Sequence, residues 1–253
     1  MYKCASFLRK QESNKRIDTI GIAMRYFLKI APKNIGLSLF LLISLCTLKS
    51  FVSAECLTVN PDSLIAAIDK DWRLVKDCSC TMEAHIRKGN VEQDRISEYI
   101  FKKPKWIRMK IIEGDNAGAE VMFDPYENEV TARASGILGI FPISFSPENS
   151  RVRSIRGHRL DENYLGFVID RWKSFLEIGE PKCSENDSLI TLEFSGMDTL
   201  KNYGAFSEKL FIGKNPILIL GFEQYSIDGI LIHSVKLRNI KSDIGLRIED
   251  FDL

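Results

Sequence analysis

The sequence predicts an α+β protein in which two or three helices cover one large, curled antiparallel β-sheet. Three observations support this prediction. Apolar residues recur at helical spacing in two segments, they alternate with polar residues in about nine others, and most links between those nine are too short for a crossover. A sheet of about nine strands tends to curl, and its apolar face needs a helix to cover it.

The first helix is predicted over residues 61–75. Asn60 can cap its N-terminus, and Pro61 suits the first helical position because its missing N–H needs no partner there. The apolar residues that follow are separated by four, four and three positions: Leu64, Ile68, Trp72 and Val75. This spacing places one apolar stripe along the helix.

Five strands are predicted next, at residues 79–88, 91–103, 105–113, 118–124 and 128–135. The turns between them are short, so neighbouring strands should run antiparallel. In the third and fourth strands, alternation places one set of apolar side chains on a single face: Ile107, Met109, Ile111, Val121 and Phe123. These residues are the candidates for lining an apolar cavity.

The second half of the chain repeats the pattern of one helix followed by strands. A helix is predicted over residues 162–178, where Gly179 and Pro181 end the helical stripe. Four further strands are predicted at residues 188–195, 204–213, 217–226 and 229–240, and a polar tail follows them. Residues 136–160, before this helix, are predicted to be irregular.

That irregular segment contains the densest charge cluster of the chain: Arg151, Arg153, Arg156, His158 and Arg159. One interpretation is that these side chains pair with carboxylates of the same chain on a solvated face. The other is a phosphate or lipid-headgroup site beside the mouth of a cavity, since the planar fork of arginine suits bidentate phosphate contacts. The sequence leaves both interpretations open.

The N-terminal segment is predicted to be a secretory signal peptide. An apolar run at residues 35–48 follows Arg25, Lys29 and Lys33, and the small residues of Val52-Ser53-Ala54 suit cleavage after Ala54. The run is shorter than the roughly 20 residues that span a membrane, although an uncleaved anchor is an alternative. Met24 would itself begin an ordinary signal sequence, so residues 1–23 are a candidate for a misassigned start.

The mature segment is acidic. The chain of 253 residues holds 35 basic and 34 acidic residues, of which residues 1–54 hold 9 and 2. Residues 55–253 therefore hold 26 basic and 32 acidic residues, a net charge of −6. Such a protein is a poor nucleic-acid binder, because affinity for a phosphate backbone depends on cationic contacts.

Four cysteines follow the predicted cleavage site: Cys56, Cys78, Cys80 and Cys183. An oxidising envelope compartment permits disulfides among them, and four cysteines allow three complete pairings. We expect at least one bridge to join the Cys78/Cys80 strand to Cys56 or Cys183. A metal-binding C-x-C is the alternative, but the second thiol pair or histidine cluster of a zinc site is missing.

The sequence carries no signature of catalysis or cofactor binding. It contains no G-x-S-x-G, Walker or Gly-rich dinucleotide motif, and His85, His158 and His233 lack metal-ligand spacing. His233 shares the strand parity of Leu231 and Val235 and should point inward. We therefore expect no cofactor, no metal and no catalytic residue, and keep a hydrolytic enzyme only as a minority alternative.

A family resemblance rests on residues in the first half of the sheet. Tyr99-Ile100-Phe101-Lys102-Lys103-Pro104, Trp106, Arg108, Val121 to Phe123, and Asp124-Pro125-Tyr126 ending at Val130 resemble the core signature of outer-membrane lipoprotein-sorting (LolA-like) proteins. The segment from Ser154 to His158, together with Gly166, is more similar to a secreted bacterial family of unknown function with that fold.

The resemblance implies a single LolA-like domain over residues 55–253, built as a half-open barrel covered by helices. It also implies an apolar cavity that carries lipid or lipoprotein acyl chains through the periplasm. Carriers of this type tend to hold their lid with an arginine before the proline that Pro104 matches. Here Lys103 occupies that position, and lysine cannot reproduce the planar fork of arginine.

Together these observations predict a periplasmic or secreted protein that binds or carries a hydrophobic or amphipathic ligand without transforming it. The expected partners are lipid or lipoprotein acyl chains, with membrane or envelope proteins as further partners. The predicted ligand-binding residues are Ile107, Met109, Ile111, Val121, Phe123, Arg108, Arg156 and His158. The alternative function is a periplasmic protein-interaction module that uses a sheet edge or its charged surface.

Overall fold

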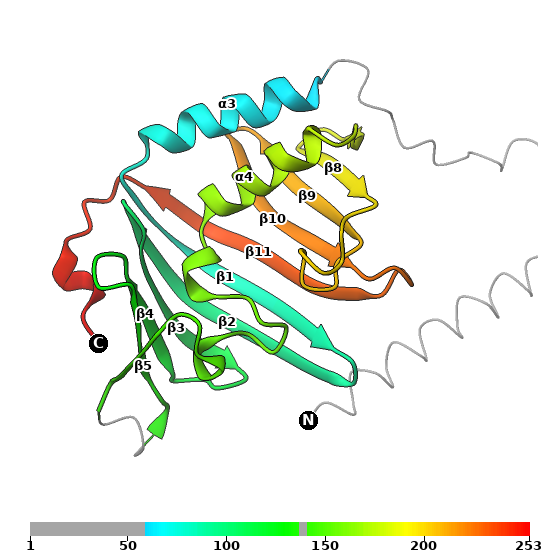
Figure 1. The fold of residues 1–253 in the computed structure, drawn as a ribbon. Helices are drawn as coiled ribbons and strands as arrows, with labels where there is room; N and C mark the ends of the chain where they lie inside the picture. Colours follow the sequence, from blue (N-terminus) through cyan, green and yellow to red (C-terminus); the bar gives the residue numbers. More distant parts are fainter. Residues whose placement is uncertain (1–58, 137–140) are drawn as a thin grey trace, which may run out of the picture. The chain divides into compact units, whose positions relative to one another are not determined.

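The structure, a computed structural model, describes residues 59–136 and 141–253 (Figure 1). These residues belong to the unit Ser53–Leu253. The predicted signal segment at residues 35–48, the cleavage site after Ala54 and Cys56 lie outside the described residues. None of the helices in the described ranges is long and apolar enough to cross a membrane.

An antiparallel sheet dominates the described part of the chain. Its eleven strands are β1 (Asp77–Lys88), β2 (Val91–Lys102), β3 (Trp106–Gly114), β4 (Glu120–Asp124), β5 (Glu129–Arg133), β6 (Ile143–Phe145), β7 (Lys182–Glu185), β8 (Leu189–Ser195), β9 (Ser207–Lys214), β10 (Ile217–Tyr225) and β11 (Leu231–Ser242). Their spatial order is β6-β5-β4-β3-β2-β1-β11-β10-β9-β8-β7. Two meanders therefore meet in the middle of the sheet.

The β1–β11 pair joins the two halves of the chain. Its register runs from Cys78 opposite Ser242 to Ile86 opposite His233, with a shift between Ser79 and Thr81. The partners lie more than 140 residues apart in the chain. Turn signals identify the hairpins on either side, but no local signal identifies this long-range pair.

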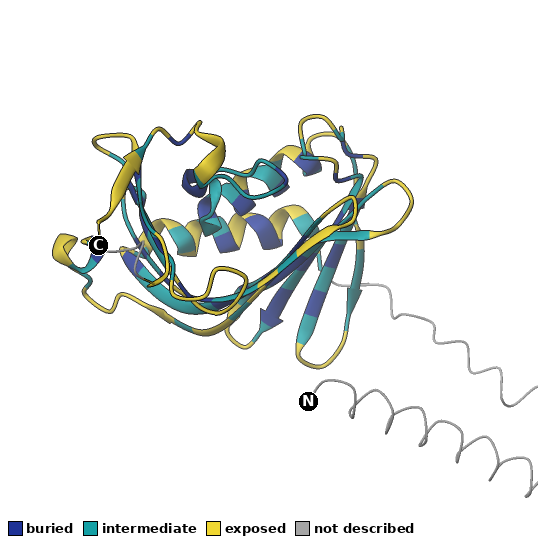
Figure 2. Ribbon diagram, turned by 90° about the horizontal axis from the view of Figure 1, so that it is seen from below, coloured by how far each residue is buried: buried dark blue, intermediate teal, exposed yellow. Residues whose placement is uncertain are grey.

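The sheet curls strongly, so that it has a concave and a convex face (Figure 2). Register shifts occur in the β2–β3 and β9–β10 pairs, and bulges of this kind bend strands and increase their twist. Only glycine fits at two of these places. A Cβ atom added to Gly114 would lie 2.0 Å from the carbonyl oxygen of Asp94. One added to Gly221 would lie 2.1 Å from the carbonyl oxygen of Val235.

Two α-helices, α3 (Pro61–Leu74) and α4 (Leu165–Leu176), lie against the concave face (Figures 1 and 2). The Asn60 side chain accepts a hydrogen bond from Ser63 N at 2.9 Å, as expected of the N-cap. Both helices bury an apolar stripe, which comprises Leu64, Ile65 and Ile68 on α3 and Val168, Ile169, Trp172 and Phe175 on α4. These stripes and the concave side chains form one hydrophobic core.

Lys103 holds the end of α3. Its Nζ atom donates to the backbone oxygens of Trp72 at 2.9 Å and Arg73 at 2.6 Å. Carbonyl groups in the last turn of a helix have no partner within the helix, and a cation also interacts favourably with the helix dipole there. The lysine therefore anchors the covering helix as a point charge, without a bidentate fork.

The predicted fold class, an α+β half-barrel, is confirmed, with differences in detail. The described chain adds two short edge strands, β6 and β7, which are too brief to show an alternating pattern. The second helix begins at Leu165 because a 3-10 turn, η3 (Leu160–Glu162), precedes it. The polar tail includes a second 3-10 turn, η4 (Ile248–Phe251), and its Phe251 ring packs 5.8 Å from Trp106.

Candidate functional site

The five apolar side chains predicted to line a cavity lie together on the concave face. Ile107 is paired with Phe123, and Met109 is paired with Val121, across β3 and β4. Ile107, Phe123 and Ile111 are buried, whereas Met109 and Val121 are partly buried. The alternation predicted from the sequence is therefore present in the sheet.

Protein atoms cover this apolar patch. Ile107 is 0% exposed and Phe123 is 3% exposed, and both belong to the main core. The Nδ2 atom of Asn163 lies 3.0 Å from Met109 Sδ, and the hydroxyl of Tyr99 donates to the Asn163 backbone oxygen at 2.9 Å. Ile107 and Phe123 thus belong to the core, Met109 and Val121 pack against it, and Ile111 is buried outside that cluster.

Arg108, also a predicted ligand-binding residue, points to the opposite face of the sheet. Its guanidinium donates to the Glu120 carboxylate at 2.7 Å and to the backbone oxygen of Asp250 at 2.9 Å. It therefore ties the C-terminal turn to β4 and lies apart from the concave patch.

In the arginine-rich cluster, Arg153 and Arg159 are paired, Arg156 is buried, and Arg151 is exposed. Arg153 forms an ion pair with Glu148, and Arg159 forms ion pairs with Glu148 at 2.7 Å and Asp161 at 2.6 Å. Intramolecular pairing thus describes these two arginines. Arg156 is only 8% exposed and donates through Nη2 to the backbone oxygen of Tyr203.

His158 lies beside Arg156, in a stack of rings on the concave side. Its ring centroid is 4.2 Å from that of Tyr203 and 4.8 Å from that of His233, and its Nδ1 atom lies 3.0 Å from Ser154 Oγ. Burial, followed by the charges of Arg156 and Arg171, lowers the pKa of His158 to about 3. His158 is therefore neutral at physiological pH.

His233 points inward, as its strand parity predicted, and is 9% exposed. Burial, together with the neighbouring His158 and arginine charges, holds its pKa well below the usual value. Gln224 lies opposite it in the β10–β11 register. The two residues extend the polar cluster across the centre of the sheet.

Glu208 is the centre of a second buried network, which the sequence prediction missed. The residue is 0% exposed, and its carboxylate accepts hydrogen bonds from Arg171 at 2.9 Å, Trp172 Nε1 at 2.7 Å and Gln224 Nε2 at 2.8 Å. The sequence did contain a signal for this network. Glu208 alternates in step with Leu210 and Ile212 along β9, which places an acidic side chain on the inward face of the strand.

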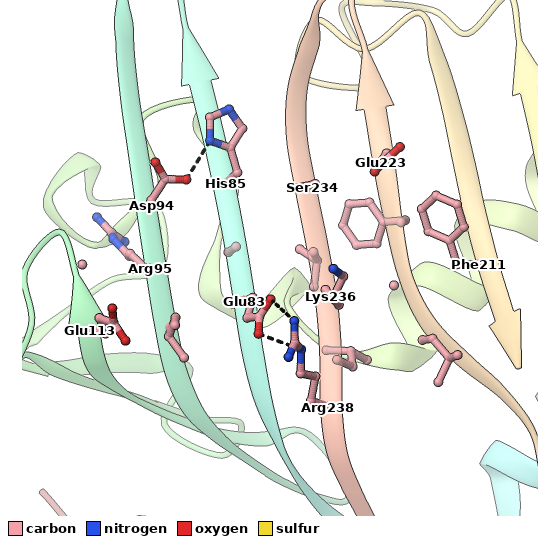
Figure 3. Close-up of a pocket in the computed structure, with 18 of the residues that line it drawn as sticks. Glu83, His85, Asp94, Arg95, Glu113, Phe211, Glu223, Ser234, Lys236 and Arg238 are labelled. Atoms are coloured by element: carbon pink, nitrogen blue, oxygen red, sulfur yellow. Dashed lines mark hydrogen bonds and ion pairs between the residues drawn. The ribbon is translucent and has the colours of Figure 1, made fainter. Parts of the chain in front are cut away.

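A groove of about 690 Å³ lies on the other face of the sheet, away from the two helices (Figure 3). Its side chains come from strand positions that alternate with the core positions, such as Glu83 and His85 on β1 and Lys236 on β11. Apolar residues from four strands also line it: Ile96, Leu189, Phe211 and Leu220.

Charged side chains on β1 and β11 lie between Ile96 on β2 and the apolar residues on β10, β9 and β8 (Figure 3). Arg238 forms an ion pair with Glu83 through two contacts, at 2.7 and 3.1 Å. His85 Nδ1 lies 2.8 Å from Asp94. The groove therefore combines an apolar surface with fixed charges of both signs.

Backbone irregularities coincide with this groove. Gly114 and Gly221, at which a Cβ would collide with a neighbouring strand, both line it. Leu220 sits at the adjacent register shift and lies over Gly213, where a Cβ would be 3.3 Å from Leu220 Cδ1. Glycines and a bulge thus leave room on a face that larger side chains would fill.

Comparison with known proteins assigns neither a family nor a function to the chain. No family model matches the chain, and no curated protein matches it. Solved structures do match.

The chain is similar to a solved LolA superfamily protein. That protein, from Nitrosomonas europaea, matches with 12% identity and a TM-score of 0.36, over 78% of this chain and 99% of its own. An uncharacterised conserved protein from Thermus thermophilus matches with 13% identity and a TM-score of 0.45, over 75% of this chain and 91% of its own. The Pseudomonas aeruginosa MucA/MucB complex matches with 10% identity and a TM-score of 0.40, over 77% of this chain and 61% of the matched chain.

The matching structures thus include the superfamily that the sequence resembles. With at most 13% identity and a TM-score of at most 0.45 among these three, the similarity concerns the fold and assigns no ligand, partner or activity to this chain.

The predicted bridge from the Cys78/Cys80 strand is not formed in the structure, where both residues are free thiols. Burial raises the pKa of each thiol to about 12. Both side chains are partly buried and pack against the concave core. Cys183, by contrast, is not a free thiol.

Cys183 lines a second pocket, of about 860 Å³, beside the N-terminus of α3. Val59, Asn60 and Pro61 contribute to the same pocket. Within the described ranges, no group of three or more His, Cys, Asp or Glu side chains is arranged to hold a metal ion.

Proposed function

We propose that this chain is an exported envelope protein that binds one amphipathic ligand, with a single alkyl chain, in the groove on the outer face of the sheet. The ligand would be held without a covalent step. The observation that supports this proposal best is the gathering of Leu189, Phe211 and Leu220 on the adjacent strands β8, β9 and β10, on the face opposite the core, with Ile96 on β2 in the same groove.

An antiparallel sheet that packs its core on one face normally presents polar side chains on the other. Here four apolar side chains, from β2, β8, β9 and β10, depart from that pattern around one groove. Its volume of about 690 Å³ is typical of small-molecule pockets. Exposed apolar patches with a polar border often mark binding sites.

The charged side chains of the groove favour an amphipathic ligand over a purely apolar one. Glu83 and Arg238 form an ion pair and neutralise each other. The Asp94 carboxylate contacts His85 Nδ1 at 2.8 Å. Lys236 and Glu113 also line the groove and make no ion pair within the described chain. Arg95 and Glu223 line the groove as well and make no ion pair within the described chain, so charged groups of both signs are available to a polar headgroup.

The expected affinity follows from the alkyl chain. Burying about ten methylene groups at about 0.8 kcal/mol each yields about 8 kcal/mol before ordering costs. Such a gain is sufficient for micromolar binding if the groove is preformed.

The concave patch of Ile107, Met109, Ile111, Val121 and Phe123 is the competing site for the same ligand class. Binding there would require the covering segment around Asn163 to move away from Met109. The outer groove needs no such movement, and for this reason we favour it.

Displacement of a fluorescent fatty acid, combined with thermal unfolding, tests the proposal. We expect Phe211→Ser and Leu220→Ser to weaken binding about tenfold or more, with little change in melting temperature, because each removes apolar surface from the groove. Met109→Gln should instead lower the melting temperature and leave binding unchanged. Ile112→Ser is the matched control, since Ile112 is 47% exposed on β3 and lies outside the groove.

If Met109→Gln abolishes binding and Phe211→Ser does not, the binding site lies on the concave face and not in the outer groove. If the wild type shows no saturable uptake of any single-chain amphiphile, the ligand-binding function is wrong and a protein-interaction module replaces it.

A further inference from the structure

The segment from Ser150 to Tyr164, here called the strap, buries an arginine that has no counter-ion among the described residues. Arg156 lies in a turn closed by hydrogen bonds from Ser154 N to the His158 oxygen at 3.0 Å and from Gly157 N to the Ser154 oxygen at 2.8 Å. The residue is 8% exposed. Its Nη2 atom donates to the Tyr203 backbone, and its Nη1 atom is buried without a partner in the described chain.

The buried carboxylate that binds Gln224 does not neutralise Arg156. Glu208 is already occupied, because its carboxylate accepts from Arg171, Trp172 and Gln224. Within the described residues, Arg156 forms no ion pair. Burial lowers its pKa to about 10, so the guanidinium stays charged at neutral pH.

Two other buried groups of the same cluster also lack partners in the part of the chain that is described: His233 Nδ1 and Gln224 Oε1. The two residues are opposite each other on β11 and β10, and the His233 ring stacks 4.8 Å from His158, two residues from Arg156. The orientation of the Gln224 amide follows from its neighbour. Its nitrogen must donate to Glu208, which leaves the oxygen as an unpaired acceptor.

Buried polar groups in native proteins are almost always hydrogen-bonded, and a buried charge without a partner is strongly unfavourable. The missing partner must carry negative charge for Arg156 and offer a hydrogen-bond donor to Gln224. A carboxylate or a halide has the charge but no donor. An oxyanion with an O–H group has both, and its oxygens match the guanidinium fork.

We propose that Arg156, His233 and Gln224 contribute to a buried binding site for a small oxyanion that carries an O–H group, of which hydrogen phosphate is the simplest example. The site lies beneath the strap, on the concave side of the sheet, and is separate from the outer groove. It does not depend on the alkyl ligand proposed above.

Titration with inorganic phosphate at constant ionic strength, with chloride as the balancing anion, tests the site. We expect calorimetry to show one saturable site in the wild type, and the melting temperature to rise with phosphate concentration. Arg156→Gln should weaken phosphate binding about tenfold or more, because it removes a charge-assisted contact. Arg153→Gln, on the same strap but paired with the exposed Glu148, should bind as the wild type does.

Thermal unfolding in phosphate-free buffer separates this role from a structural one. Arg156→Gln should then melt at the same temperature as the wild type or higher, since it removes an uncompensated charge. A lower melting temperature combined with an unchanged phosphate response would overturn the proposal. Arg156→Lys keeps the charge and should retain part of the phosphate response, which provides a second reading should the glutamine variant fail to fold.

Vesicles distinguish free phosphate from a lipid headgroup as the source of the oxyanion. Sedimentation with phosphatidic acid vesicles, but not with phosphatidylcholine vesicles, that requires Arg156 would make the headgroup the ligand. Binding of inorganic phosphate alone would identify a free anion. If the wild type responds to neither probe, the site does not exist.

Discussion

The indole N–H of Trp172 donates to the carboxylate of Glu208 across 2.7 Å, and both residues are 0% exposed. This bond joins α4 to β9 at the centre of the core. The same carboxylate accepts from Arg171 at 2.9 Å and Gln224 at 2.8 Å. One acidic residue thus fixes the covering helix on the sheet and neutralises a largely buried arginine.

Removing this carboxylate should be strongly destabilising. We expect Glu208→Ala to lower the free energy of unfolding by about 3 to 5 kcal/mol, because Arg171 is left as an unpaired, largely buried charge. Urea denaturation measures the change. The control is Glu193→Gln, which affects a half-exposed pair with Lys209 at 4.0 Å and should change stability by less than about 0.5 kcal/mol. Equal effects of the two variants would contradict the network.

Stability should fall as the pH drops below about 6.5, the usual pKa of histidine. The folded state holds the pKa of His158 at about 3, so the unfolded chain binds a proton that the folded chain does not. The free energy of unfolding therefore decreases as the pH falls from about 6.5 to about 3. At pH 5, His158 alone should lower it by about 2 kcal/mol. The lowered pKa of His233 acts in the same direction.

Urea denaturation at pH 7.5 and pH 5 measures this dependence. The double variant His158→Phe/His233→Phe keeps aromatic rings in both places but cannot take up the protons. We expect its stability to vary less with pH than that of the wild type. An unchanged pH dependence in the double variant would assign the effect to other groups.

The cysteines should differ in reactivity. Burial raises the pKa of Cys78 and Cys80 to about 12, so iodoacetamide should modify them only after unfolding. We expect Cys183 to be bridged to Cys56. Val59 and Cys183 line the same pocket, and the three residues from Val59 back to Cys56 span at most about 10 Å.

Peptide mapping under non-reducing conditions identifies the bridge. A linked peptide that contains Cys56 and Cys183 is the expected result. A bridge to Cys78 or Cys80, or rapid alkylation of all four cysteines in the folded protein, would show the assignment to be wrong.

The exported protein should begin at Glu55. The apolar run at residues 35–48 and the small residues before Glu55 motivate this prediction. N-terminal sequencing of the envelope fraction measures the start directly. A protein that retains residues 35–48 and resists carbonate extraction would instead be anchored in the membrane.

The sequence by itself was sufficient for both α-helices, nine of the eleven strands and the two faces of the sheet, but not for the short strands β6 and β7. Asn60 and Pro61 mark the start of α3, and strict alternation places Ile107, Phe123 and His233 on the concave side. These signals are local, because capping and side-chain alternation depend only on neighbouring residues. For the same reason, the short hairpin links predicted antiparallel strands correctly.

Only the tertiary structure decided what occupies each face. The pairing of β1 with β11 brings Gln224 and His233 beneath the strap, and it unites Ile96 with Phe211 in one groove. β1 and β11, like Ile96 and Phe211, lie far apart in the chain, and no local pattern encodes their proximity. Whether an apolar face becomes core or cavity depends on the volume that the covering helices fill, which is a property of the packed molecule.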